Sequence, residues 1–166
     1  MAYAFEEHLI IFAFTDIMDS ILLYSDETFM KEALKEAQKA FDADEVPVGA
    51  VIVCNNKVIA RAHNLTERLN DVTAHAEMQA ITAAANFLGS KYLTDCTLYV
   101  TLEPCIMCAG ALFWTQISRV VYAASDPKRG YTLLQKNILH PKTKVDFGIM
   151  KEKAGSIMQD FFLKKR

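Results

Sequence analysis

The sequence of 166 residues contains little cysteine and no long hydrophobic segment. Four cysteines are too few for the disulfide scaffold of a small secreted domain. No segment approaches the roughly 18 apolar residues that a membrane-spanning helix needs. The longest early run, Leu9 to Phe14, has six residues, and Glu6 and Glu7 stand where a secretory signal peptide would carry positive charge. We therefore expect a cytoplasmic protein that has reduced cysteines and no membrane partner.

The length and composition fit one ordinary folded domain preceded by an unusual segment. Hydrophobic residues make up 52% of the chain and charged residues 23%, which excludes a wholly disordered protein. The sequence contains no internal repeat, low-complexity segment or linker between domains. Residues 1–25 are apolar and acidic without a clear period. We predict an N-terminal extension of unknown role at residues 1–25 and a single domain at residues 26–166.

Charge is distributed unevenly along a chain whose net charge is only −2. Residues 1–30 carry −6 and residues 31–118 carry −3, whereas residues 119–166 carry +7. A basic C-terminal third on an otherwise acidic chain suggests a local binding surface for a polyanion. A solvated charged helix at the end of the domain would give the same balance, so charge alone leaves both interpretations open.

Hydrophobic periodicity alternates between the helical and the strand pattern along residues 26–166. Apolar residues recur at helical spacing from Phe29 to Phe41, and the turn dipeptide Asn55-Asn56 predicts a hairpin. The predicted helices are 26 to 42–45, 74–88, 104–115 and 151–166, and the predicted strands are 49–54, 57–62, 97–101, 119–123 and 145–147, with a polar loop at 64–73. This order of elements predicts an α/β layered domain with a mixed sheet.

Two short segments, 75–77 (His-Ala-Glu) and 104–108 (Pro-Cys-Ile-Met-Cys), contain the side chains best suited to chemistry. Cys105 and Cys108 lie three residues apart at the start of a helix, where the helix dipole favours the thiolates that a metal needs. A Cys-x-x-Cys pair alone could equally be a redox pair. Together with His75, the two cysteines offer three ligands of mixed nitrogen and sulfur type and one open position, which is the layout of catalytic zinc.

Glu77 lies two residues after His75 and is therefore expected beside the metal rather than on it. Such a carboxylate can take a proton from water and deliver it to a substrate. Taken singly, these residues have simpler interpretations: a helix cap for His75, a first-turn acid for Glu77 and small core residues for the cysteines. Their combination favours one Zn²⁺ per subunit, held by His75, Cys105 and Cys108, with Glu77 as the catalytic residue.

These motifs resemble the zinc-dependent cytidine deaminase superfamily, and the residues around them resemble its bacterial tRNA-specific adenosine deaminases. The matching segments include 45–50 (Glu-Val-Pro-Val-Gly-Ala), 62–64 (Ala-His-Asn), 97–110, 125–130 (Ser-Asp-Pro-Lys-Arg-Gly) and 161–166 (Phe-Phe-Leu-Lys-Lys-Arg). The resemblance implies a three-layer α/β/α cytidine-deaminase-like fold with a five-stranded mixed sheet. It also implies hydrolysis of the wobble adenosine of a tRNA anticodon to inosine, with Glu77 carrying protons to N1 and to the departing amine.

The resemblance further indicates which residues meet the anticodon stem-loop of a tRNA. Asn64 would contact the target nucleoside, and Val46 and Pro47 would form the pocket wall. The other implied contacts are Asp126, Lys128, Arg129, Phe161, Lys164, Lys165 and Arg166. A homodimer is expected because the family forms homodimers.

Three other functions would account for part of these features. A deaminase of free guanine, cytosine or a nucleoside needs the same zinc and glutamate but no polyanion surface, and the basic C-terminal third favours tRNA over it. A catalytically silent zinc-binding partner of another deaminase has no need of Glu77. A redox Cys-x-x-Cys protein would not explain why His75 and Glu77 accompany the cysteines.

Overall fold

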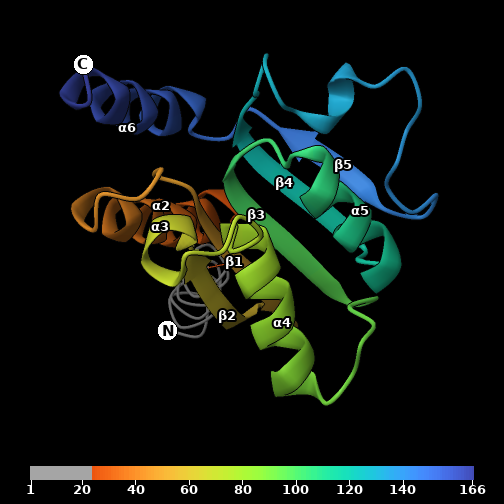
Figure 1. Ribbon diagram of the computed structural model, residues 1–166. Helices are drawn as coiled ribbons and strands as arrows, with labels where there is room; N and C mark the ends of the chain where they lie inside the picture. Colours follow the sequence, from red (N-terminus) through yellow and green to blue (C-terminus); the bar gives the residue numbers. More distant parts are fainter. Residues whose placement is uncertain (1–23) are drawn as a thin grey trace, which may run out of the picture.

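Five strands form one mixed sheet with the order β2-β1-β3-β4-β5 in the computed structural model, which describes residues 24–166 (Figure 1). The strands are β1 (Gly49–Cys54), β2 (Lys57–His63), β3 (Cys96–Leu102), β4 (Arg119–Ala124) and β5 (Lys144–Phe147). β1 runs antiparallel to β2 and β3, whereas β3, β4 and β5 run parallel to one another. Asn55 and Asn56 both have positive φ and close the predicted hairpin. The mixed five-stranded sheet is confirmed.

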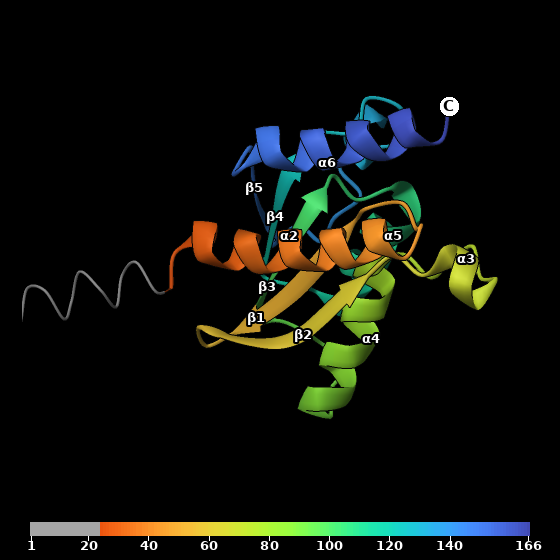
Figure 2. The same ribbon diagram turned by 90° about the vertical axis from the view of Figure 1, so that its left-hand side faces the viewer.

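Helices cover both faces of this sheet. α2 (Asp26–Asp42) and α6 (Lys151–Lys164) pack on one face, and α4 (Ala76–Leu88) and α5 (Ile106–Thr115) pack on the other (Figure 2). A four-residue helix, α3 (Thr66–Leu69), and a 3-10 turn, η1 (Tyr131–Leu133), lie in the connecting loops. This arrangement confirms the predicted three-layer α/β/α fold.

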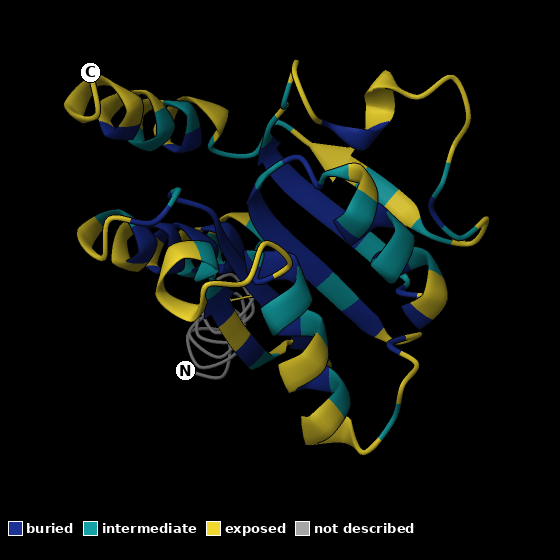
Figure 3. Ribbon diagram, in the orientation of Figure 1, coloured by how far each residue is buried: buried dark blue, intermediate teal, exposed yellow. Residues whose placement is uncertain are grey.

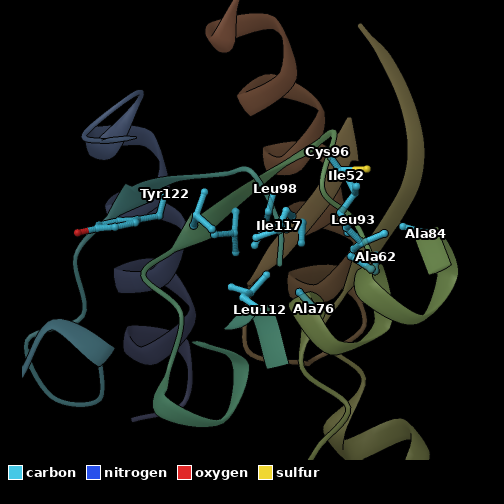
Figure 4. Packing of buried hydrophobic residues seen from close by; sticks show 14 of the residues in the cluster. Ile52, Ala62, Ala76, Ala84, Leu93, Cys96, Leu98, Leu112, Ile117 and Tyr122 are labelled. Atoms are coloured by element: carbon cyan, nitrogen blue, oxygen red, sulfur yellow. The ribbon is translucent and has the colours of Figure 1, made fainter. Parts of the chain in front are cut away.

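Alternate residues of the central strands contribute to two separate cores. In β3, Leu98 and Val100 face α4 and α5, whereas Tyr99 faces α2 and α6. Figure 4 shows the first core, in which Leu112 of α5 lies near Leu98 and Ile117. The central strands are buried on both faces, as their dark colour in Figure 3 shows. Double-sided burial explains why these strands are continuous apolar runs in the sequence rather than alternating ones.

The predicted helices and strands agree with the structure except at some ends and in one loop. The loop predicted at 64–73 contains α3, which was not predicted. The helices predicted from residues 74 and 104 begin at Ala76 and Ile106, because His75 and Cys105 have extended backbone and are the N-cap residues. The last helix ends at Lys164 instead of continuing to the final residue.

The predicted N-terminal extension at residues 1–25 lies outside the described residues, apart from Tyr24 and Ser25. Ser25 is the N-cap residue of α2, and its side chain accepts a hydrogen bond from Thr28 N at 3.2 Å. The extension itself stays a prediction. Within residues 24–166, no helix is long and apolar enough to cross a bilayer.

A polar cluster fixes the beginning of α2 against the sheet. Asp26 accepts hydrogen bonds from Arg119 Nη1 and Nη2, at 2.7 Å each, and from the Tyr99 hydroxyl at 2.6 Å. Arg119 also donates from Nε to Asp146 at 2.7 Å. The hydrogen bond from Arg119 is the main reason why the pKa of Asp26 lies below its ordinary value. The cluster ties α2 to β3, β4 and β5 at the amino-terminal end of β4.

Gly49, the first residue of β1, marks a very close approach between the sheet and α2. A Cβ atom at this position would lie 2.1 Å from Ala33 O and 2.2 Å from Ala37 N, and both of these are backbone atoms of α2. A flexible side chain could move away from such a contact, but a helix backbone cannot without displacing the helix. Glycine is therefore required at this position.

We expect Gly49→Ala to destabilise the protein by about 1–3 kcal/mol or more, because overpacking a core costs about this much and here the contact is with backbone. Urea unfolding measures the change. Gly155→Ala in α6 is the matched control, since a Cβ atom there meets nothing within 4 Å. The control should be unchanged or stabilised by about 1 kcal/mol, because alanine is the better helix former. A Gly49→Ala protein as stable as the wild type would contradict the close approach.

Candidate active site

Three side chains from two distant segments of the chain form a cluster of metal-ligating atoms. His75 is the N-cap residue of α4, Cys105 is the N-cap residue of α5, and Cys108 lies in the first turn of α5. His75 Nδ1 lies 3.6 Å from the Sγ atom of Cys105 and 3.6 Å from that of Cys108. All three ligand atoms lie within 4.8 Å of one another. The structure thus brings together the three predicted metal ligands.

The distances between the ligand atoms fit a tetrahedrally coordinated zinc ion. Zinc bonds of about 2.3 Å to sulfur and about 2.0–2.1 Å to nitrogen, at tetrahedral angles, place the two ligand atoms about 3.6 Å apart. Hydrogen bonding alone explains the cluster less well, because Nδ1 has either one hydrogen or one lone pair and so makes one well-directed hydrogen bond, not two. One imidazole and two thiolates are also a donor set that suits zinc. These residues can hold a zinc ion and leave a fourth position open.

The electrostatics of the cluster favour a bound cation. The hydrogen bond between the two thiols lowers the pKa of Cys105 to about 4, against the opposing effect of burial, and raises the pKa of Cys108. The hydrogen bond with Cys105 raises the pKa of His75. One thiolate is therefore available at neutral pH, and a metal ion would have to displace the proton of the second thiol and any proton on His75 Nδ1.

Glu77, in the first turn of α4, is a buried carboxylate beside this cluster. Only 3% of its surface is exposed. Burial raises its pKa to about 7, which suits a group that both accepts and donates protons near neutral pH. Within residues 24–166, the group of candidate metal ligands contains His75, Cys105 and Cys108 but not Glu77. Its position fits the predicted role beside the metal.

The loop that follows β2 borders the cluster on one side. Leu65 N donates a hydrogen bond to Ala74 O at 3.0 Å, which places this loop directly beside the residue that precedes His75. Asn64 N donates to Val48 O at 3.1 Å, so Asn64 also lies next to the segment before β1. The structure therefore places Asn64 near the cluster and beside the segment that contains Val46 and Pro47, and the substrate contacts of all three stay predictions.

The loop that follows β4 borders the cluster on the other side. Glu103 is buried and accepts hydrogen bonds from Asp126 N at 3.0 Å and from Thr132 N and Oγ1 at 3.0 and 2.7 Å. The side chain of Asp126 accepts from the backbone N–H groups of Lys128 and Arg129, at 2.9 and 3.1 Å. Asp126 thus holds the turn, and its predicted contact with a nucleic-acid backbone stays a prediction.

The same loop carries two basic residues. Lys128 and Arg129 are both exposed. The positive charge of Arg129 acts on His75, whose protonation it opposes. Arg129 therefore lies within electrostatic reach of the metal ligands, and the substrate contacts of both residues stay predictions.

The predicted contacts at the C-terminus lie at the end of α6, away from the metal ligands. Phe161 is only 5% exposed and packs edge-on against Phe41 of α2, with ring centroids 6.0 Å apart. Lys165 forms an ion pair with Asp44, and Lys164 Nζ lies 5.5 Å from the centroid of the Phe41 ring. In Figure 2 this end of α6 lies on the same side of the molecule as α3. Contacts of Phe161, Lys164, Lys165 and Arg166 with substrate stay predictions, and Phe161 has a clear packing role.

Three further residues shape these loops: Glu45, Thr66 and Glu103. The sequence predicts a structural role for Glu103, which precedes α5, but no role for Glu45 or Thr66. Glu45 and Glu103 are fully buried carboxylates next to the site motifs. An acid in an apolar stretch beside such a motif is a usable signal, because a buried charge needs several hydrogen-bond donors around it. Thr66 gives no such signal, since most polar loop residues are solvated.

Sequence comparisons with known proteins point in the same direction as the geometry of the site. The sequence profile of the MafB19-like deaminase family matches residues 24–166. The tRNA-specific adenosine deaminase of Bacillus subtilis is 47% identical over 146 residues, covering 85% of this chain and 91% of that protein. The tRNA-specific adenosine deaminase of Aquifex aeolicus is 46% identical over 145 residues, covering 84% and 95%. The chain belongs to the family of tRNA-specific adenosine deaminases.

A solved structure supports this assignment for the three-dimensional fold. It comes from structural studies of A-to-I editing by tRNA:A34 deaminases and superimposes on this deaminase with a TM-score of 0.73. The two chains are 44% identical, and the match covers 78% of this chain and 97% of the other. The resemblance that the sequence motifs indicated is confirmed at the level of family and fold.

Purified protein is expected to contain about one zinc ion per chain, because the cluster supplies three ligands of the preferred type. Cys108→Ser should lower the zinc content, since a serine hydroxyl is a poor zinc ligand. Cys54→Ser is the matched control, because Cys54 lies at the end of β1 and is absent from the cluster. Elemental analysis measures both. A wild-type protein without zinc, or Cys108→Ser with full zinc, would contradict the assignment.

Proposed function

We propose that this deaminase hydrolyses the wobble adenosine of a tRNA anticodon to inosine, with release of ammonia. The cluster of His75, Cys105 and Cys108 with the buried Glu77 beside it carries the proposal. It occurs in a chain whose relatives at 46–47% identity are named tRNA-specific adenosine deaminases. The alternative substrate class, a free guanine, cytosine or nucleoside, is not favoured by these relatives.

The residues of the site divide the chemistry between them. When bound by His75, Cys105 and Cys108, zinc supplies a Lewis acid that makes water nucleophilic near neutral pH. Glu77 accepts a proton from the water that adds at C6 and delivers it to N1 of the adenine ring. Glu77 then takes the remaining proton from the hydroxyl on C6 and gives it to the amine, so that the C6–N bond breaks, the C6 carbonyl forms and ammonia leaves. Adenosine and water are thereby converted to inosine and ammonia, and a pKa of about 7 suits Glu77 to both transfers.

The loops around the cluster bind the RNA. The bases of an anticodon loop are not paired, so one of them can enter the pocket beside Val46, Pro47 and Asn64 without the opening of a duplex. Lys128 and Arg129 contact phosphates next to the reacting base, and the basic end of α6 contacts phosphates further away. This proposal places the enzyme in the cytoplasm and, by analogy with its family, in a homodimer.

Glu77→Gln should abolish most inosine formation and leave zinc bound, because the carboxylate moves protons but is not a ligand. General acid–base groups contribute about 10²–10⁴-fold, and the loss should reach the upper end because Glu77 serves several transfers. Inosine in tRNA, zinc content and tRNA affinity are measured side by side. A variant that deaminates within about tenfold of the wild type refutes the role. A variant that also loses zinc makes Glu77 a ligand or a structural residue.

Replacing Lys164, Lys165 and Arg166 together by alanine should weaken tRNA binding and flatten its dependence on salt. Each lost phosphate contact lowers the slope of log affinity against log salt by about 0.7–0.9, because fewer counterions are released. A triple alanine replacement of Lys31, Lys35 and Lys153 is the control, since these residues line a groove between α2 and α6. The control removes the same charge and should leave the slope unchanged. If all three proteins have equal slopes, the C-terminal charge is only solvated surface.

A further inference from the structure

Glu45 is a buried anion without a cationic partner. Its side chain has 0% of its surface exposed, and within residues 24–166 no lysine, arginine or histidine forms an ion pair with it. Burial opposes its ionisation, yet hydrogen bonds from the backbone N–H groups of Arg68 and Glu67 and from Thr66 outweigh burial and keep its pKa below the ordinary value. An isolated buried carboxylate is costly, so its hydrogen bonds must fix it firmly in one place.

Two of these hydrogen bonds cap α3 from a distance. The carboxylate accepts from Arg68 N at 2.8 Å and from Glu67 N at 3.2 Å. These are the second and third residues of α3, whose N–H groups an N-cap side chain normally satisfies. The actual N-cap residue is Leu65, which has no polar side chain and makes no such bond. Glu45 therefore does the work of an N-cap residue although it lies before β1.

The same carboxylate sets the direction of a short chain of hydrogen bonds that ends at Asn64. The Thr66 hydroxyl donates to Glu45 Oε2 at 3.2 Å and so accepts from Asn64 Nδ2, at 3.1 Å. Asn64 Nδ2 also lies 3.5 Å from Glu45 Oε2. An ionised carboxylate only accepts hydrogen bonds, so the amide must turn its NH₂ group, and not its oxygen, toward Glu45.

This arrangement leaves the amide oxygen of Asn64 free. Among the described residues, no side chain or backbone group donates a hydrogen bond to Asn64 Oδ1. No buried side-chain polar atom of these residues lacks a partner, so Oδ1 is not sealed inside the protein. Asn64 lies beside Ala74 and His75 through the bond from Leu65 N to Ala74 O. The free oxygen therefore belongs to a residue at the border of the active site.

We propose that Glu45 is a positioning residue, which acts through Thr66 to hold the Asn64 amide with its oxygen available to accept a hydrogen bond from the bound nucleotide. The proposal rests on the proposed function, because it assigns the orientation of a residue in that substrate pocket. It predicts that the pocket recognises a donor group, an amine or hydroxyl hydrogen, at this point. Glu45 itself contacts no reacting atom.

The test is a double-mutant cycle between Glu45→Gln and Asn64→Ala, measured with a tRNA anticodon stem-loop. Glutamine has one acceptor oxygen and an NH₂ group that cannot accept, so the amide of Asn64 loses its fixed orientation. We expect Glu45→Gln to lower kcat/KM by about 10- to 100-fold while zinc content stays unchanged. In the Asn64→Ala background the same change should cost less than about threefold, because residues that act through one another are not additive. Full additivity would overturn the proposal.

Two further comparisons separate positioning from loss of stability. Asp26→Asn removes the charge and one of the two oxygens that accept hydrogen bonds from Arg119 and Tyr99, so it should lower the unfolding temperature and leave kcat/KM unchanged. Thr66→Val interrupts the chain of hydrogen bonds but leaves the carboxylate and its backbone bonds in place, and Thr66→Ser keeps the hydroxyl. We expect Thr66→Val to lose activity and Thr66→Ser to retain it. If Glu45→Gln does not fold, this pair decides the question, and equal activity of the two variants overturns the proposal.

Amide hydrogen exchange provides a measurement that needs no substrate. The N–H groups of Glu67 and Arg68 should be protected in the wild type and should exchange faster in Glu45→Gln, by about 10- to 100-fold. Unchanged exchange at both amides would contradict the remote cap. If wild-type protein forms no inosine in tRNA, the proposed function fails, whereas the exchange experiment still reports whether Glu45 organises this loop.

Discussion

The active site depends on two helices, α4 and α5, that begin at the same end of the sheet. α4 leads the chain away from this end, β3 returns the chain to it, and α5 begins where β3 ends. Residues about thirty positions apart in the sequence therefore face each other, so that one imidazole nitrogen lies 3.6 Å from two sulfurs. The two N-cap positions matter for this, because an extended N-cap residue directs its side chain out of the helix end and not along its side.

Hydrogen bonds, more than apolar packing, fix the loops on either side of this centre. Glu45 accepts bonds from the loop after β2, and Glu103 accepts bonds from the loop after β4. Gly130 lies so close to Glu103 that a Cβ atom there would come within 2.3 Å of its carboxylate. Both carboxylates lie next to segments that enter the site, and both bind backbone N–H groups. Hydrogen bonds depend on direction, whereas apolar contacts do not. They therefore hold a short loop in one conformation more firmly than apolar contacts would.

The sequence predicts α2, α4, α5, α6 and the longer strands because each is long enough to show a period, and it predicts the centre because His75, Glu77, Cys105 and Cys108 form a recognisable pattern of spacing. It does not predict α3. Four residues cannot display a helical period, and the group that caps this helix, Glu45, lies more than twenty residues earlier. The role of Phe161 is also ambiguous in the sequence, because an aromatic residue gives the same signal whether it stacks on a base or packs against Phe41.

The basic end of α6 and the pocket are connected through the short segment between α2 and β1. Lys165 pairs with Asp44, and Asp44 directly precedes Glu45, which orders the loop that contains Asn64. The ion pair is largely exposed, with 45% of the lysine side chain and 69% of the aspartate side chain accessible. Exposed pairs of this kind contribute about 0–1 kcal/mol, so the pair holds Lys165 only weakly. Glu45, in contrast, is buried and bound by several donors and stays fixed. The segment between α2 and β1 thus carries an exposed anion in a weak ion pair, Asp44, directly before a buried anion, Glu45, that fixes the loop after β2.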